Sequence, residues 1–274
     1  MVVSPSLRRL LIAKSGLASS TAAEFVVHRF FVPPSALAAT PILLENGTLH
    51  HLRTVLRLSV GDELILLDGG GALCHARITR MGKKQGLAEP LARWSEEEHP
   101  LRLHLLQGLP KGEKMELVLQ KGTELGVKRF TPIFSQRTQR VKGGAKAARW
   151  EKIVQEAARQ CRRPSLPSLD RPSSLVEALE KEKAPLKLML WEEGSVPLSQ
   201  VLPCEPPSAI AFLVGPEGGF SFEEAALAQE HGFLPVSLGP RILRSETAGF
   251  TLAAILQYLY GDLNSSPVPA AAPR

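Results

Sequence analysis

From Leu101 onward the chain alternates between short apolar runs and helical patterns, and this alternation constrains the fold more than any other feature. Parallel sheets with helices on both faces are built in this way, so we predict an α/β domain. Ligands of such sheets bind in crevices at the carboxyl ends of the strands. The expected strands are 101–107, 130–134, 186–190, 209–214 and 234–238, and the expected helices are 112–125, 147–162, 221–231 and 245–260.

Two glycine-rich segments directly follow two of these expected strands. The first reads LVGPEGGFS at 213–221, and the second reads LGPRILRSET at 238–247. Neither has the Gly-Lys-Ser/Thr ending of a Walker A loop or the spacing of a dinucleotide fingerprint. Because glycines let the backbone approach a ligand closely, two such loops on one sheet edge predict a crevice for a flat ligand. The first loop taken alone is also consistent with a tight turn between a strand and a helix.

Acidic residues after the first loop indicate the chemistry of that ligand. Ser221 is a predicted N-cap, and Glu223 and Glu224 fall in the first turn of the helix that follows. Carboxylates at this helix end would repel a phosphate. We therefore expect a ligand without phosphate groups at the first loop.

The second loop holds an apolar pair between two arginines, Arg241 and Arg244. Ile242 and Leu243 could pack on the face of an adenine while backbone groups meet its edge. An arginine beside that pocket could bind a phosphate or stabilise negative charge that develops on a substrate. Ser245 is a predicted N-cap for the helix that follows.

Composition excludes several classes of protein. The 274 residues are 44% hydrophobic and 22% charged, as in ordinary globular proteins, and no apolar run approaches membrane-spanning length. Cys74, Cys161 and Cys204 form neither a disulfide framework nor a zinc pattern, and we expect each to be a small buried hydrophobe. The seven histidines are scattered, so we predict no metal site and no nucleophilic catalysis.

The net charge of +6 is unevenly distributed. Residues 128–163 hold eleven Lys or Arg against two glutamates, a net +9, which leaves the rest of the chain at −3. A basic block in an otherwise near-neutral protein predicts a surface for a polyanion. A solvated helix face would have the same composition.

Changes in composition predict the domain organisation. Residues 1–24 carry basic residues with no acid before Glu24, which is typical of a transit peptide but equally of a disordered extension. Residues 26–92 read as a small β-rich domain, with a strand at 26–32, a short helix at 48–58 and a hairpin at 62–79. The acidic segment 95–100 is the expected linker to an α/β domain over 100–262, and 263–274 is an expected disordered tail.

Five ordered motifs resemble the RsmE family of ribosomal RNA methyltransferases, which belongs to the SPOUT superfamily. Besides the two glycine-rich segments, they are QKGTELGV at 120–127, EAARQCRR at 156–163, and the N-terminal RFF at 29–31 with HHLRTVLR at 50–57. The resemblance spans about residues 28–262. The chain departs from the family at Arg159, where an acidic residue is expected.

The resemblance implies an N-terminal PUA-like β-barrel, here 26–92, and a C-terminal SPOUT α/β domain with a trefoil knot, here 100–262. It implies a homodimer that uses S-adenosylmethionine to methylate N3 of one uridine in small-subunit (16S) ribosomal RNA, either as naked RNA or in the assembled subunit. Arg244 is the expected catalytic residue, because it could stabilise the deprotonated uracil. The expected cofactor-binding residues are Leu190, Leu213, Val214, Gly215, Pro216, Gly218, Gly219, Leu238, Gly239, Ile242, Leu243 and Thr247. The expected RNA-binding residues are Arg29, Arg53, Arg57, Arg137 and Arg163.

Two other functions stay open at this point. A SPOUT enzyme could act on another base or on a ribose hydroxyl, and a non-catalytic ribosome-assembly factor could have kept the fold. Intact glycine-rich loops favour an enzyme, because a protein without a donor ligand has little reason to keep Gly215, Gly218 and Gly219 together. We expect a cytoplasmic protein with no membrane partner, and residues 1–24 leave import into an organelle open.

Overall fold

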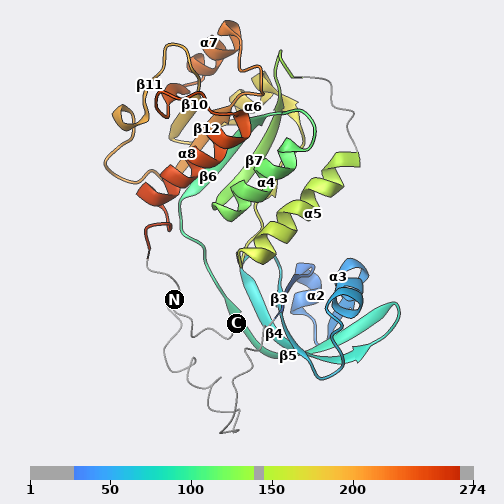
Figure 1. Cartoon of the computed structure of the whole chain (residues 1–274). Helices are drawn as coiled ribbons and strands as arrows, with labels where there is room; N and C mark the ends of the chain where they lie inside the picture. The colour runs from blue at the N-terminus through green and yellow to red at the C-terminus, as the bar shows by residue number, and fades with distance from the viewer. Residues whose placement is uncertain (1–27, 139–144, 266–274) are drawn as a thin grey trace. The chain divides into compact units, whose positions relative to one another are not determined.

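The computed structural model describes residues 28–138 and 145–265, which carry one sheet of five strands followed by one of eight (Figure 1). The predicted extension at 1–24 and residues 266–274 of the predicted tail lie outside the described residues. In the described ranges, no helix combines the length and the apolar character needed to cross a membrane.

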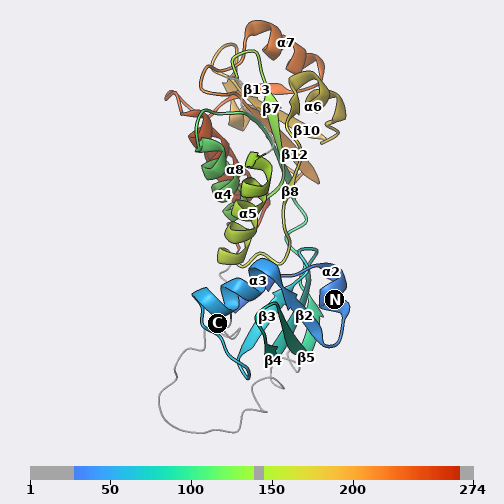
Figure 2. The ribbon, with the colours of Figure 1, turned by 90° about the vertical axis from the view of Figure 1, so that its right-hand side faces the viewer.

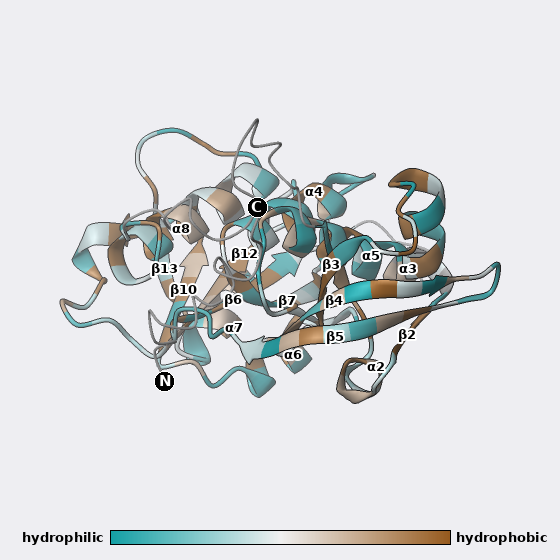
Figure 3. Ribbon diagram, turned by 90° about the horizontal axis from the view of Figure 1, so that it is seen from below, coloured by the Kyte–Doolittle hydropathy of each residue, from teal (hydrophilic) through white to brown (hydrophobic). Residues whose placement is uncertain are grey.

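The N-terminal sheet is mainly antiparallel. Its elements are β1 (His28–Phe31), α2 (Pro34–Ala38), β2 (Ile42–Glu45), α3 (Asn46–His50), the π-helix η1 (His51–Val55), β3 (Glu63–Leu67), β4 (Ala72–Met81) and β5 (Gln85–Ser95). The strand order is β1-β3-β4-β5-β2, and only β1 and β3 pair in parallel. Hydrophobic and hydrophilic residues alternate along β5 (Figure 3). Such alternation places one face of the sheet on a core, which contains Ile42, Leu64 and Leu66.

The sequence predicts part of this sheet. The expected hairpin is present as β3 and β4, and the expected helix over 48–58 is present as α3 and η1. The sequence does not predict β2, β5 or α2. Gly86 and Pro90 lie inside β5, and in the sequence both are turn signals.

The C-terminal sheet is parallel throughout. Its elements are β6 (Arg102–Gly108), α4 (Lys114–Glu124), β7 (Val127–Phe134), α5 (Ala145–Gln160), β8 (Ser168–Leu169), β9 (Ser173–Ser174), α6 (Leu175–Lys181), β10 (Leu186–Leu190), β11 (Val196–Pro197), the 3-10 helix η2 (Leu198–Gln200), β12 (Ala209–Val214), α7 (Phe222–Glu230), β13 (Leu234–Ser237) and α8 (Ser245–Tyr260). The order is β11-β13-β10-β12-β6-β7-β8, and β9 also pairs with β7.

Helices cover both faces of this sheet, as the alternation predicts. Helices α4, α5 and α8 lie on one side, where Leu105 of β6 joins their core, and α6 lies on the other (Figure 2). Leu106, the next residue, points into the second core with α6 and α7. The predicted parallel α/β domain is confirmed, and each predicted strand and helix ends within three residues of its expected bounds. Helix α6 and the two-residue strands β8, β9 and β11 are too short for their periodicity to predict them.

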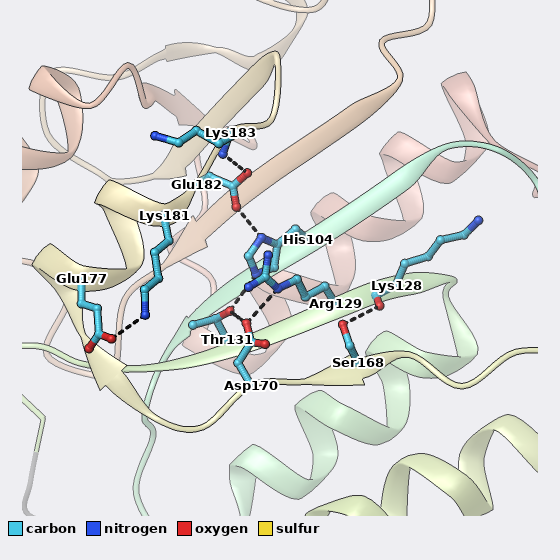
Figure 4. Close-up of polar contacts among 10 residues, drawn as sticks. All are labelled: His104, Lys128, Arg129, Thr131, Ser168, Asp170, Glu177, Lys181, Glu182 and Lys183. Atoms are coloured by element: carbon cyan, nitrogen blue, oxygen red, sulfur yellow. Dashed lines mark hydrogen bonds and ion pairs between the residues drawn. The ribbon is translucent and has the colours of Figure 1, made fainter. Parts of the chain in front are cut away.

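Hydrogen-bonded polar side chains lead from Glu182, just after α6, over β6 and β7 to Asp170 (Figure 4). We call Glu182, His104, Thr131, Asp170 and Arg129 the His104 cluster. His104 Nδ1 contacts the Glu182 carboxylate, and His104 Nε2 lies 2.8 Å from Thr131 Oγ1. Thr131 donates its hydroxyl hydrogen to Asp170, which also accepts from Arg129 Nε at 2.8 Å. The second oxygen of Glu182 accepts two backbone N–H groups, at 2.8 and 2.7 Å. Burial would raise the pKa of Glu182, but these hydrogen bonds outweigh burial and lower it.

Candidate cofactor and RNA site

Both glycine-rich segments emerge at the same edge of the parallel sheet. Leu190, the last residue of β10, lies opposite Val214 of β12 and Val236 of β13. The first segment follows β12 and the second follows β13, so the two loops lie one strand apart, with the chain after Leu190 between them. The two predicted loops and the chain after Leu190 therefore lie at three consecutive strand ends, where ligands of parallel sheets bind.

The first loop is held tightly against its neighbours. A Cβ atom at Gly108, the end of β6, would lie 2.6 Å from Cδ of Pro216, so glycine is required for this approach. Gly219 has φ +68°, a conformation that favours glycine. Arg137 Nη1 donates to the Gly218 carbonyl at 2.6 Å. The loop is thus fixed by β6 on one side and by the chain after β7 on the other.

Helix α7 begins as the sequence predicts. Ser221 is its N-cap, and Ser221 and Glu224 form a reciprocal capping box. Glu224 Oε1 also accepts the Gln136 N–H at 2.7 Å. Glu223 lies in the first turn and is exposed. Acidic side chains therefore stand at the helix end that adjoins the first loop, as predicted.

Helix α8 begins differently from the prediction, because Ser245 is not its N-cap. The N-cap is Arg244, and its side chain makes no capping hydrogen bond. The Ser245 hydroxyl instead donates to the Gly215 carbonyl, and it accepts from Gln107 Nε2 at 2.9 Å. The serine thus joins the start of α8 to the first glycine-rich loop, although β13 and β12 are not neighbours in the sheet.

The predicted cofactor residues differ in accessibility. Leu213 and Val214 are core residues on opposite faces of β12, so any contact they make with a ligand is through the backbone. Ile242 is 78% exposed, and its partner Leu243 is half-buried. Pro216 is buried; Leu190, Gly219, Leu238 and Thr247 are half-buried; Gly218 and Gly239 are exposed, and Gly215 is buried.

Arg244 is exposed at the start of α8, and Arg241 is exposed three residues earlier. Among the described residues, neither guanidinium donates a hydrogen bond or lies within 4 Å of a carboxylate. Both side chains are therefore available to a ligand.

Three charged side chains join the two loops at their base, and we call Lys114, Glu217 and Glu246 the Lys114 cluster. Lys114 Nζ lies 3.0 Å from Glu217 Oε1 and 3.6 Å from Glu246 Oε2. The Glu217 carboxylate also accepts the Lys111 N–H, at 3.0 and 3.2 Å. Burial would raise the pKa of Glu217, but hydrogen bonds from the backbone and from Lys114 lower it overall. The hydrogen bond to Glu217 raises the pKa of Lys114, so this ammonium is charged at neutral pH.

Arg163 does not fit its predicted role. It is 8% exposed, and its Nε and Nη2 atoms donate to the two oxygens of Glu98, each at 2.9 Å. Its Nη1 donates to the carbonyls of Thr123 and Val127, at 3.0 and 2.8 Å. A buried arginine with this set of partners holds the linker to α4 and β7, so the structure does not support RNA binding by Arg163.

Much of the basic block is paired in the same way. Arg129 bonds Asp170, Arg149 lies 2.7 Å from Glu116, and Arg159 bonds Glu156. Asp170 and Glu116 lie outside residues 128–163, so their pairs lower the positive field below what the net +9 of the block suggests. Residues 139–144, which carry part of the block, lie outside the described residues.

The other predicted RNA-binding arginines differ among themselves. Arg29 is half-buried and donates to the Arg162 carbonyl at 2.7 Å. Arg53, Arg57 and Arg137 are exposed.

The three cysteines differ in burial. Cys74 is buried, Cys161 is half-buried and Cys204 is exposed, so the expectation that all three are buried is wrong for Cys204.

Sequence reasoning misses Gln107, Lys114 and Glu246, which lie at the base of the loops. Gln107 is a fully buried polar residue at the end of an apolar strand, just before Gly108. A polar residue at the carboxyl end of a predicted parallel strand is a signal that could have identified it. Lys114 gives no such signal, because its partners are 103 and 132 residues away in the sequence.

Comparison with known proteins identifies the family of this chain. A family model described as an RNA methyltransferase domain matches residues 97–257, and one described as an RNA methyltransferase PUA domain matches 44–91. Ribosomal RNA small subunit methyltransferase E of Synechocystis is 34% identical over 253 residues, which are 90% of this chain and 83% of that protein.

Solved structures agree with this result. Ribosomal RNA small subunit methyltransferase E from Neisseria gonorrhoeae, bound to S-adenosylmethionine, is 35% identical with a TM-score of 0.80, over 86% of this chain and 99% of the other. A methyltransferase from Legionella pneumophila, in complex with the same cofactor, is 38% identical with a TM-score of 0.77, over 84% of this chain and 97% of the other. The chain therefore belongs to the RNA methyltransferase family and, within it, to the ribosomal RNA small subunit methyltransferase E group.

Proposed function

We propose that this chain is an S-adenosylmethionine-dependent methyltransferase that modifies N3 of one uridine in small-subunit ribosomal RNA. The observation that supports this proposal most directly is the arrangement at one sheet edge. Two glycine-rich loops lie one strand apart there, and Arg244 is exposed at the end of the second loop. Relatives named for ribosomal RNA small subunit methylation, and structures of such proteins with S-adenosylmethionine, support the proposal.

The residues at this edge fit that cofactor. S-adenosylmethionine carries a sulfonium cation and no phosphate, and the first turn of α7 holds the exposed Glu223 and the buried Glu224 beside the first loop. Residues 217–219 and 239–242 are exposed or half-buried, so these parts of the two loops can approach the adenine and the ribose, and Leu243 supplies apolar contact. When bound, the cofactor supplies an electrophilic methyl group on sulfur.

The role of the chain is to position the uridine and to favour its deprotonated form. Uracil N3 carries a proton at neutral pH, so the site must stabilise the negative charge left on the ring when this proton is lost. Arg244 is our catalytic residue because its guanidinium is exposed and unpaired among the described residues, between Leu243 and the first turn of α8. Positioning and charge stabilisation favour the transfer once the N3 proton has passed to solvent, and the sequence identifies no residue as a general base.

For the RNA, we propose contacts from Arg53 and Arg57 of the N-terminal domain and from Arg137 beside the first loop. The end of β4 adds Arg80, and the turn between β4 and β5 adds Lys83 and Lys84; all three are exposed. Arg53 Nη1 donates to the Gly82 carbonyl of this turn at 3.3 Å. These side chains would bind phosphates, so the double variant Lys83→Ala/Lys84→Ala should lower the salt dependence of RNA binding by a slope of about 1.5. The matched control is Lys181→Ala/Lys183→Ala on and beside α6. If the slope equals that of the protein without these substitutions, this turn is not part of the RNA-binding surface.

A homodimer is the expected assembly, and the α4 and α8 face supports it. Tyr258 and Leu259 near the end of α8 are 57% and 52% exposed, and Leu117 of α4 is 40% exposed. A helix that is apolar on both sides is usually covered on both sides. Sedimentation of the full chain and of a Leu259→Glu variant tests the assembly, and a monomer at all concentrations in both would contradict it.

We also propose the finer features of the fold and the location that the resemblance implies: a PUA-like barrel, a trefoil knot in the SPOUT domain, and activity in the cytoplasm. The match to relatives over both domains supports these features, of which the trefoil knot can be tested directly. Extension by force from residues 101 and 262 tests it, because a knotted chain reaches a shorter contour length than an unknotted one.

The decisive experiment incubates the full chain with a labelled methyl donor and either naked small-subunit ribosomal RNA or assembled subunits that lack the modification. We expect one methylated uridine, modified at N3, and the two arms identify the substrate form. Calorimetric titration with S-adenosylmethionine separates an enzyme from a non-catalytic assembly factor. Binding of the cofactor without methyl transfer to either RNA form would contradict the proposed function.

A further inference from the structure

The Lys114 cluster joins three parts of the chain that are distant in sequence. Lys114 is the first residue of α4, Glu217 lies in the first glycine-rich loop, and Glu246 lies in the first turn of α8, directly after the second loop. The two carboxylates thus belong to the two loops of the proposed cofactor site. The ammonium that lies between them comes from neither loop.

Among the described residues, Lys114 is the only cationic side chain that lies within 4 Å of both carboxylates. Its Nζ atom is 3.0 Å from Glu217 and 3.6 Å from Glu246, and Glu246 has no other cationic partner in the described ranges. The Glu246 side chain is 9% exposed, and its Oε2 atom accepts no hydrogen bond from a described residue. A buried carboxylate with so few partners depends on the nearby positive charge.

Loss of the ammonium would leave two carboxylates facing each other from the two loops. Two carboxylates that share one ammonium lie close enough to repel each other without it, and the repulsion is stronger where water is partly excluded. The Ser245 hydroxyl would remain the main polar link between the start of α8 and Gly215. The loops would then separate, and the N-cap Arg244 would move with the first turn of α8.

We propose that Lys114 is a positioning residue for the methyl-transfer reaction: it neutralises Glu217 and Glu246 together and so holds the two cofactor loops at the separation that S-adenosylmethionine requires. Lys114 does not touch the cofactor in this account. Its effect is on the affinity for the cofactor, because binding of the cofactor itself can draw separated loops together again. The inference rests on the proposed function only through the choice of S-adenosylmethionine as the ligand.

The test compares four variants of the full chain by calorimetric titration with S-adenosylmethionine and by steady-state methyl transfer. Lys114→Met should raise the Kd and the KM for the cofactor about tenfold, with kcat at saturating cofactor within about threefold. Lys114→Arg, which keeps the charge, should stay within about threefold of the unmodified protein. The double variant Lys114→Met/Glu217→Gln removes the repulsion as well as the ammonium, so it should recover most of the lost affinity. Lys181→Met, which removes an exposed ammonium paired with Glu177 on α6, is the matched control and should change nothing.

The outcomes separate this inference from the proposed function. If the unmodified chain does not bind S-adenosylmethionine, the proposed function fails. If it binds and Lys114→Met binds equally well, the positioning role fails alone. The role also fails if the double variant binds no better than Lys114→Met, since a residue needed only for folding would not be rescued by loss of a second side chain. Thermal unfolding of each variant identifies any that do not fold. If Lys114→Met does not fold, the double variant is compared with Lys114→Arg instead. The positioning role then fails if the double variant binds the cofactor much more weakly than Lys114→Arg.

Discussion

The His104 cluster and the Lys114 cluster lie in the same domain, but they satisfy their polar atoms very differently. In the His104 cluster every buried side-chain nitrogen and oxygen has a hydrogen-bond partner, and Glu182 has three. In the Lys114 cluster, Glu246 Oε2 accepts no hydrogen bond from a described residue, and neither does the fully buried Oε1 of Gln107, which bonds Ser245 next to Glu246. Native proteins satisfy nearly all buried polar groups, and the exceptions concentrate at functional sites. The contrast assigns stability to the first cluster and function to the second.

The largest expected effect falls on catalysis at the loop edge. Arg244→Ala should lower kcat by about 10²–10³ at saturating RNA and cofactor, because the charge on the deprotonated uracil would lose its stabilising partner. The Kd for S-adenosylmethionine and the free energy of unfolding should stay near their original values, since Arg244 is exposed and unpaired among the described residues. Rates under single-turnover conditions measure the effect.

Arg241→Ala is the matched control for that prediction. Arg241 is an exposed arginine in the same loop, three residues before Arg244. It should keep most of the original kcat. Full activity of Arg244→Ala would remove the catalytic role that we assign to Arg244.

The second prediction tests the stability assigned to the His104 cluster. His104→Leu leaves the buried Glu182 carboxylate without its ring partner and Thr131 without its contact to the ring. A buried carboxylate oxygen that loses its hydrogen-bond partner typically costs about 3 kcal/mol in the free energy of unfolding. The Kd of the folded variant for S-adenosylmethionine should not change. Urea unfolding and calorimetry measure the two quantities, and a variant as stable as the original would contradict the assignment.

The sequence predicts where the site lies, but it predicts the charge pairs of neither cluster. The period of the apolar residues predicts the parallel sheet, and the glycines at 215–219 and 238–239 predict which strand ends hold the site. Arg163 shows the limit of that reasoning. Its basic neighbours suggest a polyanion surface, whereas its actual partner Glu98 lies 65 residues earlier, in the segment predicted to be a linker. Charge pairs that the tertiary fold brings together have no local signature, and this holds for Lys114 and His104 too.

Ser245 shows a different limit. A serine before a helical pattern predicts an N-cap, because its hydroxyl is expected to bond the first turn of its own helix. Here the chain after β13 passes the end of β10 and places Ser245 beside the Gly215 carbonyl, and the hydroxyl bonds this carbonyl instead. A long-range contact thus replaces the local one at the point where the two loops meet.

The third prediction concerns Gln107, whose amide belongs to the loop edge. Its Nε2 atom donates to Ser245 Oγ at 2.9 Å, but its Oε1 atom is buried without a partner among the described residues. Gln107→Met removes the link and the unsatisfied oxygen together, so the free energy of unfolding should change by less than about 1 kcal/mol. The Kd for S-adenosylmethionine should rise several-fold, because Ser245 and the first loop lose a fixed donor. A large loss of stability with unchanged affinity would place Gln107 with the structural cluster.

The smallest effect, and the finest test of the contrast, is the pH dependence of stability. The pKa of Glu182 is lower in the folded chain than its ordinary value of 4.5, so its ionisation stabilises the fold fully above pH 4.5. This stabilisation declines as the pH falls from 4.5 through the folded-state pKa. Urea unfolding at pH 7 and pH 4 should therefore show a loss of stability that Glu182→Gln reduces by about 1 kcal/mol. Glu217→Gln in the Lys114 cluster should reduce it less, although the pKa of Glu217 is also lowered, because solvent screens this more exposed carboxylate. Equal reductions in the two variants would mean that both carboxylates serve stability, and the division between the clusters would not hold.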